Sequence, residues 1–355
     1  MTDNTDGKQL SAAPTYATSV VIPLWNRASL VRHTLNSLQA SHHLSVSLEI
    51  IVVVDGSTDG GADLIAEEYP HVVVLRQAHQ GAAVARNHGI AASTAATILL
   101  LDSDDLIEPG FFAPKHLALE SHPNADGAYG PWDVFCSDGE FREGAVRPQH
   151  GVYPLEASVG SATHLVRLLR GWYIAPHAIL WRSEALRRVG GHTEGLALNQ
   201  DVDLLFRMLI SAAGIVGVPG PRALYRQHYG EREGRIGGSH AKATAALLLR
   251  RDFVARLRAS DRLDFAAREA LGHYCFDRWS ELRQELPDIA EGFLDLSREV
   301  YPELQLRGRW PLRAASAVLG PARAQRLRDS VERTLGTRSA TGVFPTDTRH
   351  RMGNS

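Results

Sequence analysis

Short apolar segments alternate with segments of helical periodicity between residues 19 and 101, and this alternation restricts the fold more than any other feature of the chain. The predicted strands are 19–23 (SVVIP), 48–55 (LEIIVVVD), 72–75 and 98–101. The predicted helices between them are 29–40, 60–69 and 81–92. Strands that alternate with helices form βαβ units and a parallel sheet. The sequence therefore predicts an α/β fold, a Rossmann-like sheet with helices on both faces.

Polar clusters follow three of these strands at the point where each strand ends. They are Pro23-Leu24-Trp25-Asn26-Arg27, Asp55-Gly56-Ser57-Thr58-Asp59 and Asp102-Ser103-Asp104-Asp105. In open α/β sheets ligands bind at the carboxyl ends of the strands, so we expect the clusters to share one rim. The third cluster places like charges close together, which repel. A divalent cation, which prefers oxygen ligands, would offset that repulsion.

The rest of the chain has fewer regular signals. Residues 175–191 predict a strand that leads into a helix ending at Gly190-Gly191, and 199–209 predict a helix whose first turn contains Asp201 and Asp203. From residue 240 to about 336 the chain is rich in Ala, Leu and Arg and predicts helices. The polar ends, 1–16 and 337–355, lack an apolar period, and we expect both to be disordered tails.

Composition excludes several classes of protein. The net charge of −2 gives no support for a nucleic-acid partner. Cys136 and Cys275 are far apart and lack metal-type spacing, as expected in a reducing compartment. We find neither a secretory signal nor an apolar run of membrane-spanning length, so we expect a cytoplasmic protein. The arginines between 307 and 328 make the helical region 240–336 a candidate for peripheral contact with the inner face of a membrane, or with a second copy in a homodimer.

Seven short motifs occur in order between residues 19 and 228. They are SVVIPLWNR (19–27), IIVVVDGSTDG (50–60), GAAVARNHGIAAS (81–93), LLLDSDDLIEPG (99–110), ILWRSEALRRVGG (179–191), QDVDLLFRM (200–208) and YRQH (225–228). In this order and spacing the chain resembles the family-2 glycosyltransferases, nucleotide-sugar-dependent enzymes of the GT-A fold. The resemblance implies a GT-A domain at 17–239, with a nucleotide-sugar-binding half (17–110) and an acceptor half (111–239), followed by the helical region 240–336.

The resemblance also assigns a donor site. It places Trp25 beside the nucleobase, with Pro23 and Asn26 on the same loop, and Asp55 as the carboxylate that hydrogen-bonds the base. Asp102-Ser103-Asp104 matches the DXD motif that holds Mn²⁺ or Mg²⁺ together with the donor ribose and diphosphate. Two roles remain open for Arg86, which either pairs with a carboxylate inside the fold or contacts a phosphate.

The acceptor side is assigned in the same way. Asp201 matches the general base for the acceptor hydroxyl, while Gln200 stands where relatives have a glutamate. The helix start and the missing glutamate charge lead us to expect a low pKa for Asp201. His228 falls at the position of a further metal ligand in some relatives, and His177 and Gln200 are candidate acceptor-binding residues.

The implied activity is inverting transfer of a sugar from a nucleoside diphosphate, uridine- or thymidine-linked, to a glycan, lipid-linked or small-molecule hydroxyl, as in polysaccharide or glycoconjugate biosynthesis. Two alternatives stay open. A sugar-nucleotide nucleotidyltransferase is disfavoured because PLWNRASL (23–30) lacks a glycine-rich phosphate loop. A non-catalytic nucleotide-sugar-binding relative finds support only in Gln200 and in the single aspartate at position 55.

Overall fold

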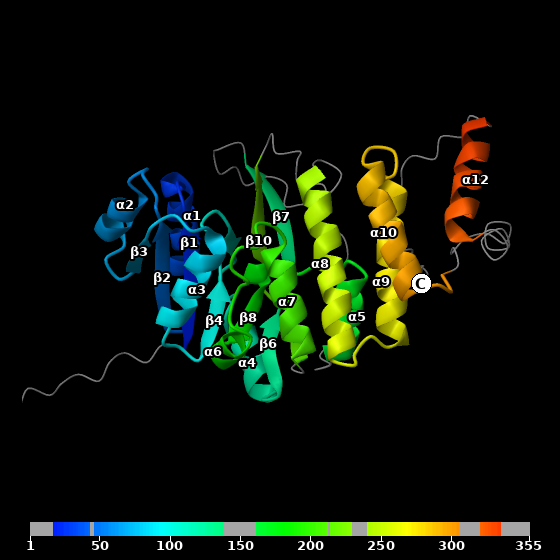
Figure 1. Cartoon of the computed structure of the whole chain (residues 1–355). Helices are drawn as coiled ribbons and strands as arrows, with labels where there is room; N and C mark the ends of the chain where they lie inside the picture. The colour runs from blue at the N-terminus through cyan, green and yellow to red at the C-terminus, as the bar shows by residue number, and fades with distance from the viewer. Residues whose placement is uncertain are drawn as a thin grey trace, which may run out of the picture. The chain divides into compact units, whose positions relative to one another are not determined.

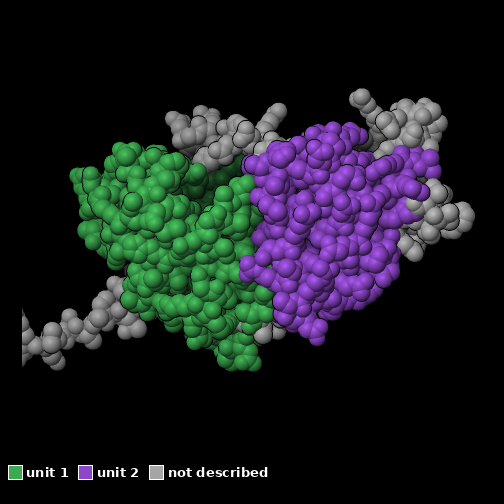
Figure 2. Space-filling model, viewed as in Figure 1, with its two compact units in different colours: residues 1–149, 154–162, 173–230 green, residues 150–153, 163–172, 231–355 purple. Residues whose placement is uncertain are grey.

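A computed structural model of the chain describes residues 17–42, 46–137, 161–211, 214–228, 240–304 and 320–334. The chain forms two compact units, coloured separately in Figure 2. The first unit contains 1–149, 154–162 and 173–230, and the second contains 150–153, 163–172 and 231–355. Residues 163–172, placed in the acceptor half from sequence, thus belong to the second unit. The two predicted tails lie outside the described residues.

The first unit is built on a seven-stranded sheet with the order β3-β2-β1-β4-β8-β6-β9 (Figure 1). Its strands are β1 (Thr18–Leu24), β2 (Leu48–Asp55), β3 (Val73–Gln77), β4 (Thr97–Leu100), β6 (Ala125–Tyr129), β8 (Ile179–Arg182) and β9 (Gly214–Gly217). The helices of this part are α1 (Ala28–His42), α2 (Gly61–Glu68), α3 (Ala82–Ala92), α4 (Ala113–Ser121), α6 (Ser183–Arg188) and α7 (Gln200–Ile210). The four strands and three helices predicted between residues 19 and 101 are all present, within a few residues of the expected bounds.

Strands β1, β2 and β4 are buried along their whole length, as the continuous apolar runs predict for parallel strands covered on both faces. The pairs β1–β2, β1–β4 and β2–β3 are all parallel. Helix α3 packs closely on β1 because Gly89 has no side chain. A Cβ atom there would lie 2.3 Å from Cγ1 of Val21.

Strand β8 lies between β4 and β6 and is antiparallel to both. Trp181 is the pairing partner of Ile98 on one side and of Gly127 on the other. A Cβ at Gly127 would lie 2.7 Å from the Trp181 ring, so glycine leaves the room that the indole occupies. The sequence predicts a strand in this region, but only its pairing with β4 and β6 shows that the strand runs antiparallel to both.

A second, three-stranded sheet has the order β5-β10-β7. Its strands are β5 (Leu106–Ile107), β7 (Trp132–Ser137) and β10 (Ala223–His228). Arg222, at the start of β10, donates hydrogen bonds to Glu108 and Asp133. These contacts tie β10 to β7 and to the end of β5, the short strand that directly follows the acidic cluster.

The second unit contains the C-terminal helices. They are α8 (His240–Ala259), α9 (Phe265–Leu282), α10 (Pro287–Val300) and α12 (Pro321–Thr334), together with most of α5 (Ser161–Leu169). Asp264 caps α9 by accepting a hydrogen bond of 2.8 Å from the Ala267 amide. The helical prediction for 240–336 is thus met where residues are described. Within those residues, no helix has the length and apolar character needed to cross a bilayer.

Candidate active site

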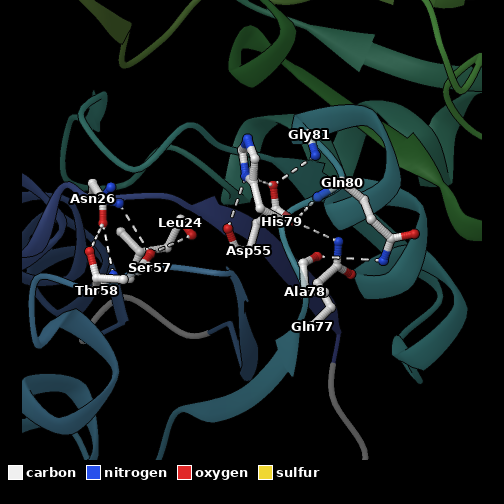
Figure 3. A network of polar contacts seen from close by, with 10 residues as sticks. All are labelled: Leu24, Asn26, Asp55, Ser57, Thr58, Gln77, Ala78, His79, Gln80 and Gly81. Carbon is white, nitrogen blue, oxygen red and sulfur yellow. Dashed lines mark hydrogen bonds and ion pairs between the residues drawn. The ribbon is translucent and has the colours of Figure 1, made fainter.

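The loops that follow β1 and β2 are joined by side-chain hydrogen bonds (Figure 3). Asn26 has a positive φ of 49°, and its Oδ1 accepts a bond of 2.9 Å from the Thr58 amide. The Asn26 amide donates to Oγ of Ser57, which in turn donates to the carbonyl of Leu24. Asn26 therefore fixes the backbone of the first loop, and its contact with the donor stays a prediction.

Asp55, at the end of β2, accepts hydrogen bonds from three protein groups. Its partners are Nε2 of Gln77 at 2.9 Å and the amides of Gln80 and Gly81, each at 2.8 Å (Figure 3). Burial alone would raise the pKa of Asp55, but these hydrogen bonds outweigh it and lower the pKa. Asp55 is therefore ionised and holds the start of α3 against β2. Its contact with a base stays a prediction.

Trp25 is half-exposed and stacks on His79, with ring centroids 4.6 Å apart and planes inclined by 21°. Nδ1 of His79 lies 2.9 Å from Oδ2 of Asp55. The structure thus brings Trp25 and Asp55 together through a histidine that the sequence analysis did not single out. Pro23 lies within β1, which continues to Leu24, and is buried.

Arginines accompany the first two carboxylates of the acidic cluster. Arg86, buried on α3, donates to Oδ1 of Asp102 at 2.5 Å and to Oε1 of Gln200 at 3.0 Å. Arg27 forms an ion pair with Asp104. Burial would lower the pKa of Arg86, but Asp102 and Asp201 raise it. Of the two roles left open for Arg86, the structure shows the internal ion pair.

Asp105 is fully buried, and its Oδ1 accepts a hydrogen bond of 2.7 Å from the Arg226 amide on β10. Its Oδ2 lies 3.2 Å from Nδ1 of His177, without the alignment of a hydrogen bond. Burial and the nearby charge of Asp102 raise the pKa of Asp105 well above its usual value. The cluster therefore limits its own repulsion: two carboxylates face arginines, and the third retains its proton to higher pH.

Replacing Asp105 by Asn tests this arrangement. A folded-state pKa above the unfolded value means that the folded protein binds more protons, so wild-type stability falls as pH rises toward the raised pKa. Asn is isosteric with the protonated carboxyl and lacks this fall. We expect Asp105→Asn to melt above wild type in EDTA, by a margin that grows as the pH rises from about 4, the ordinary pKa of an aspartate, toward neutral pH. A constant or negative margin would contradict the raised pKa.

Asp201 lies in the first turn of α7, partly exposed, with a buried Oδ1 that has no hydrogen-bond partner. Burial raises the pKa of Asp201, and Asp102 adds to the rise, while Arg86 opposes it. The expected low pKa is therefore wrong in direction, because burial and a neighbouring charge outweigh the helix dipole. Asp203 is tied to Thr193 at 2.7 Å and to Arg207 at 2.9 Å, as a structural residue would be.

Two further side chains near the acids were missed from sequence, the partly exposed Tyr173 and the buried His192. Burial raises the pKa of the Tyr173 phenol, and the charges of Asp201 and Asp102 add to the rise. Burial and the nearby charge of Arg86 lower the pKa of His192 to about 3. His177 is also fully buried, and burial lowers its pKa to about 4. Only their tertiary neighbours reveal these positions. An acceptor contact of His177 or Gln200 stays a prediction.

The carboxylates present fit a divalent metal by their chemistry. Asp102 and Asp104 offer oxygen ligands, and the charge of Asp102 also raises the pKa of the neighbouring Asp201, a repulsion that a cation would relieve. In the described part of the chain, no three acidic, histidine or cysteine side chains form a ready-made metal site. Mg²⁺ commonly binds through one or two carboxylates together with substrate phosphates, so a complete protein cage is not required. Ser103 is buried within the cluster, and the side chain of His228 lies outside the described residues.

Three known proteins illustrate what this chain is similar to. YibD of Escherichia coli, an uncharacterized glycosyltransferase, is 41% identical over 126 residues, which cover 34% of this chain and 36% of YibD. Staphylococcus aureus TarS 1–349 in complex with UDP-GlcNAc has a TM-score of 0.62 at 16% identity, covering 90% of this chain and 92% of that one. The mannosyltransferase PcManGT of Pyrobaculum calidifontis, in complex with GDP-Man and Mn²⁺, has a TM-score of 0.50 at 17% identity, covering 92% and 82%.

The chain spans well under two thirds of the length of the curated relatives that it matches first. The structural likeness shows the fold, which is GT-A with a C-terminal helical region. The sequence match is broader than any single motif, because the model of the family "Glycosyl transferase family 2" matches residues 19–189. The family match shows that residues 19–189 form a glycosyltransferase domain of family 2.

Proposed function

We propose that the chain is an inverting glycosyltransferase that uses Asp201 as its general base and a uridine or thymidine diphosphate sugar as its donor. The observation that carries this proposal is the environment of Asp201. It is partly exposed beside Arg86 and Asp102, with an unpartnered oxygen and a raised pKa. A carboxylate with a pKa closer to neutral is a stronger base for a hydroxyl proton than an ordinary aspartate.

In this mechanism Asp201 accepts the proton of the acceptor hydroxyl as its oxygen attacks the anomeric carbon. The bond to the nucleoside diphosphate breaks on the opposite face, so the configuration inverts. Arg86 keeps Asp102 in place, and its charge favours the ionised form of Asp201. The stack of Trp25 on His79 offers an aromatic surface for the base at the carboxyl ends of β1 and β3.

Asp102 and Asp104 would hold a divalent cation, Mn²⁺ or Mg²⁺, with His228 as a further candidate ligand. Such a cation neutralises the charge that develops on a leaving diphosphate. The Mn²⁺ in the PcManGT complex and the nucleotide sugars bound by TarS and PcManGT support this part of the proposal by analogy of fold. A cytoplasmic location, and contact of 240–336 with a membrane or a second copy, also belong to the proposal.

Calorimetry tests the donor and the metal together. We expect UDP to bind in Mn²⁺ and to lose about tenfold or more of its affinity in EDTA, because a diphosphate would otherwise meet the carboxylates of Asp102 and Asp104 without a cation between them. dTDP and GDP serve as comparison ligands for the base. Equal UDP affinity in Mn²⁺ and in EDTA would argue against the metal, and failure of all three nucleotides to bind would overturn the proposed function.

A further inference from the structure

Arg27 and Arg86 both neutralise carboxylates of the acidic cluster, but they are held very differently. The Arg86 side chain is 7% exposed and is bound on its other side by Gln200. The Arg27 side chain is 40% exposed, while Asp104, its partner, is 11% exposed. Arg86 is thus a fixed part of the interior, whereas Arg27 can leave its carboxylate without opening the core.

The backbone on either side of Arg27 is pinned. Asn26 is bound to Ser57 and Thr58 of the neighbouring loop (Figure 3), and the amide of Ala28 donates to Oδ2 of Asp59 at 2.7 Å. Any movement of the guanidinium therefore comes from the side chain alone. The Arg27 side chain starts two residues after Trp25 on this loop and reaches Asp104.

A cation held by Asp104 competes with Arg27 for the same carboxylate. An arginine displaced from Asp104 would lie between the predicted base site and the predicted metal site, where a bound donor has its diphosphate. Guanidinium groups bind phosphate oxygens with two parallel hydrogen bonds and are strong partners for such anions.

From this geometry, and resting on the proposed function, we infer that Arg27 exchanges partners during donor binding. It leaves Asp104 when the metal binds and then holds the donor diphosphate. Arg27 is thus a donor-binding residue that links metal occupancy to nucleotide affinity. The exchange predicts that removing Arg27 has opposite effects on the affinities of the two ligands. Arg27 hinders binding of the metal and helps binding of the nucleotide.

The test is calorimetry on Arg27→Gln with MnCl₂ alone, and then with the tightest-binding of UDP, dTDP and GDP at saturating Mn²⁺. We expect Mn²⁺ alone to bind roughly threefold more tightly than to wild type, as fits the loss of a partly exposed ion pair. We expect the nucleotide to bind about tenfold more weakly, as fits the loss of a charged hydrogen bond. Arg27→Lys keeps the charge and should restore part of the nucleotide affinity.

Arg32→Gln is the matched control, since Arg32 is an exposed arginine on α1 that pairs with Glu68. It should leave both affinities unchanged. Tighter Mn²⁺ binding without nucleotide loss, or nucleotide loss without tighter Mn²⁺ binding, would overturn the exchange. If the wild-type protein binds no nucleotide in Mn²⁺, the proposed function and the partner exchange of Arg27 both fail. If wild type binds normally and Arg27→Gln matches it, only the exchange fails. Melting temperatures check that each variant folds. If Arg27→Gln does not fold, the Mn²⁺ and nucleotide affinities of Arg27→Lys are compared with those of wild type instead.

Discussion

Asp201→Asn is expected to lose on the order of a hundredfold or more in transfer rate while it binds donor and metal as wild type does. Asn has the shape of Asp but cannot accept the hydroxyl proton. Asp201 lies in the first turn of α7, and its Oδ1 has no hydrogen-bond partner. Replacing the carboxylate therefore breaks no hydrogen bond at Oδ1. The fold should therefore persist, and binding and chemistry should separate in this one variant.

The measurement pairs donor calorimetry with release of the nucleoside diphosphate on the same preparation. Asp63→Asn is the control, because Asp63 is an exposed first-turn carboxylate of α2 that pairs with Arg76. It should retain wild-type rates. If Asp201→Asn also transfers at the wild-type rate, the base is another carboxylate. Asp203 would be examined first, despite its bonds to Thr193 and Arg207.

Arg86→Met is expected to reduce the free energy of unfolding by about 3–5 kcal/mol, because it removes one partner of a buried ion pair. Asp102 would lose its hydrogen bond of 2.5 Å, and Asp201 would lose the nearby charge that opposes its protonation. Methionine fills much of the same space, so the loss reports mainly on charge. Urea unfolding in EDTA measures it without interference from a bound cation.

A double variant distinguishes charge from packing. Arg86→Met combined with Asp102→Asn removes both charges of the pair, and we expect it to be more stable than Arg86→Met alone. Arg76→Met, at an exposed ion pair with Asp63, should cost no more than about 1 kcal/mol. If the double variant is less stable than Arg86→Met alone, the pair is not what makes Arg86 important to the fold.

Local sequence was sufficient for the elements that form the rim of the main sheet. Strands β1, β2 and β4 are continuous apolar runs, and the polar clusters follow them directly, so their common edge could be predicted. The internal pairing of Arg86 was one of two readings, because arginine in an alanine-rich helix needs a buried anion. Its actual partners, Asp102 and Gln200, come from other elements.

What could not be predicted depends on residues that meet only after folding. The ion pair of Arg27 with Asp104 joins two loops that are distant in sequence. The pKa of Asp201 was expected to be low from its place on a helix, yet burial and Asp102 raise it. His79, His192 and Tyr173 carry no motif of their own. They stand out only because His79 stacks on Trp25 and because His192 and Tyr173 lie near the charges of the acidic residues.

The antiparallel strand β8 also has a consequence for how the chain is made. Strand β4 pairs with β1 on one edge and with β8 on the other, yet β8 is synthesised only after β5, β6 and β7. On the ribosome, the β3-β2-β1-β4 half therefore presents an apolar edge with unpaired amides until residues 179–182 emerge. Unpaired edges invite association with other chains, and pairings distant in sequence form slowly. The edge of β4 is thus most open to association with other chains during this period.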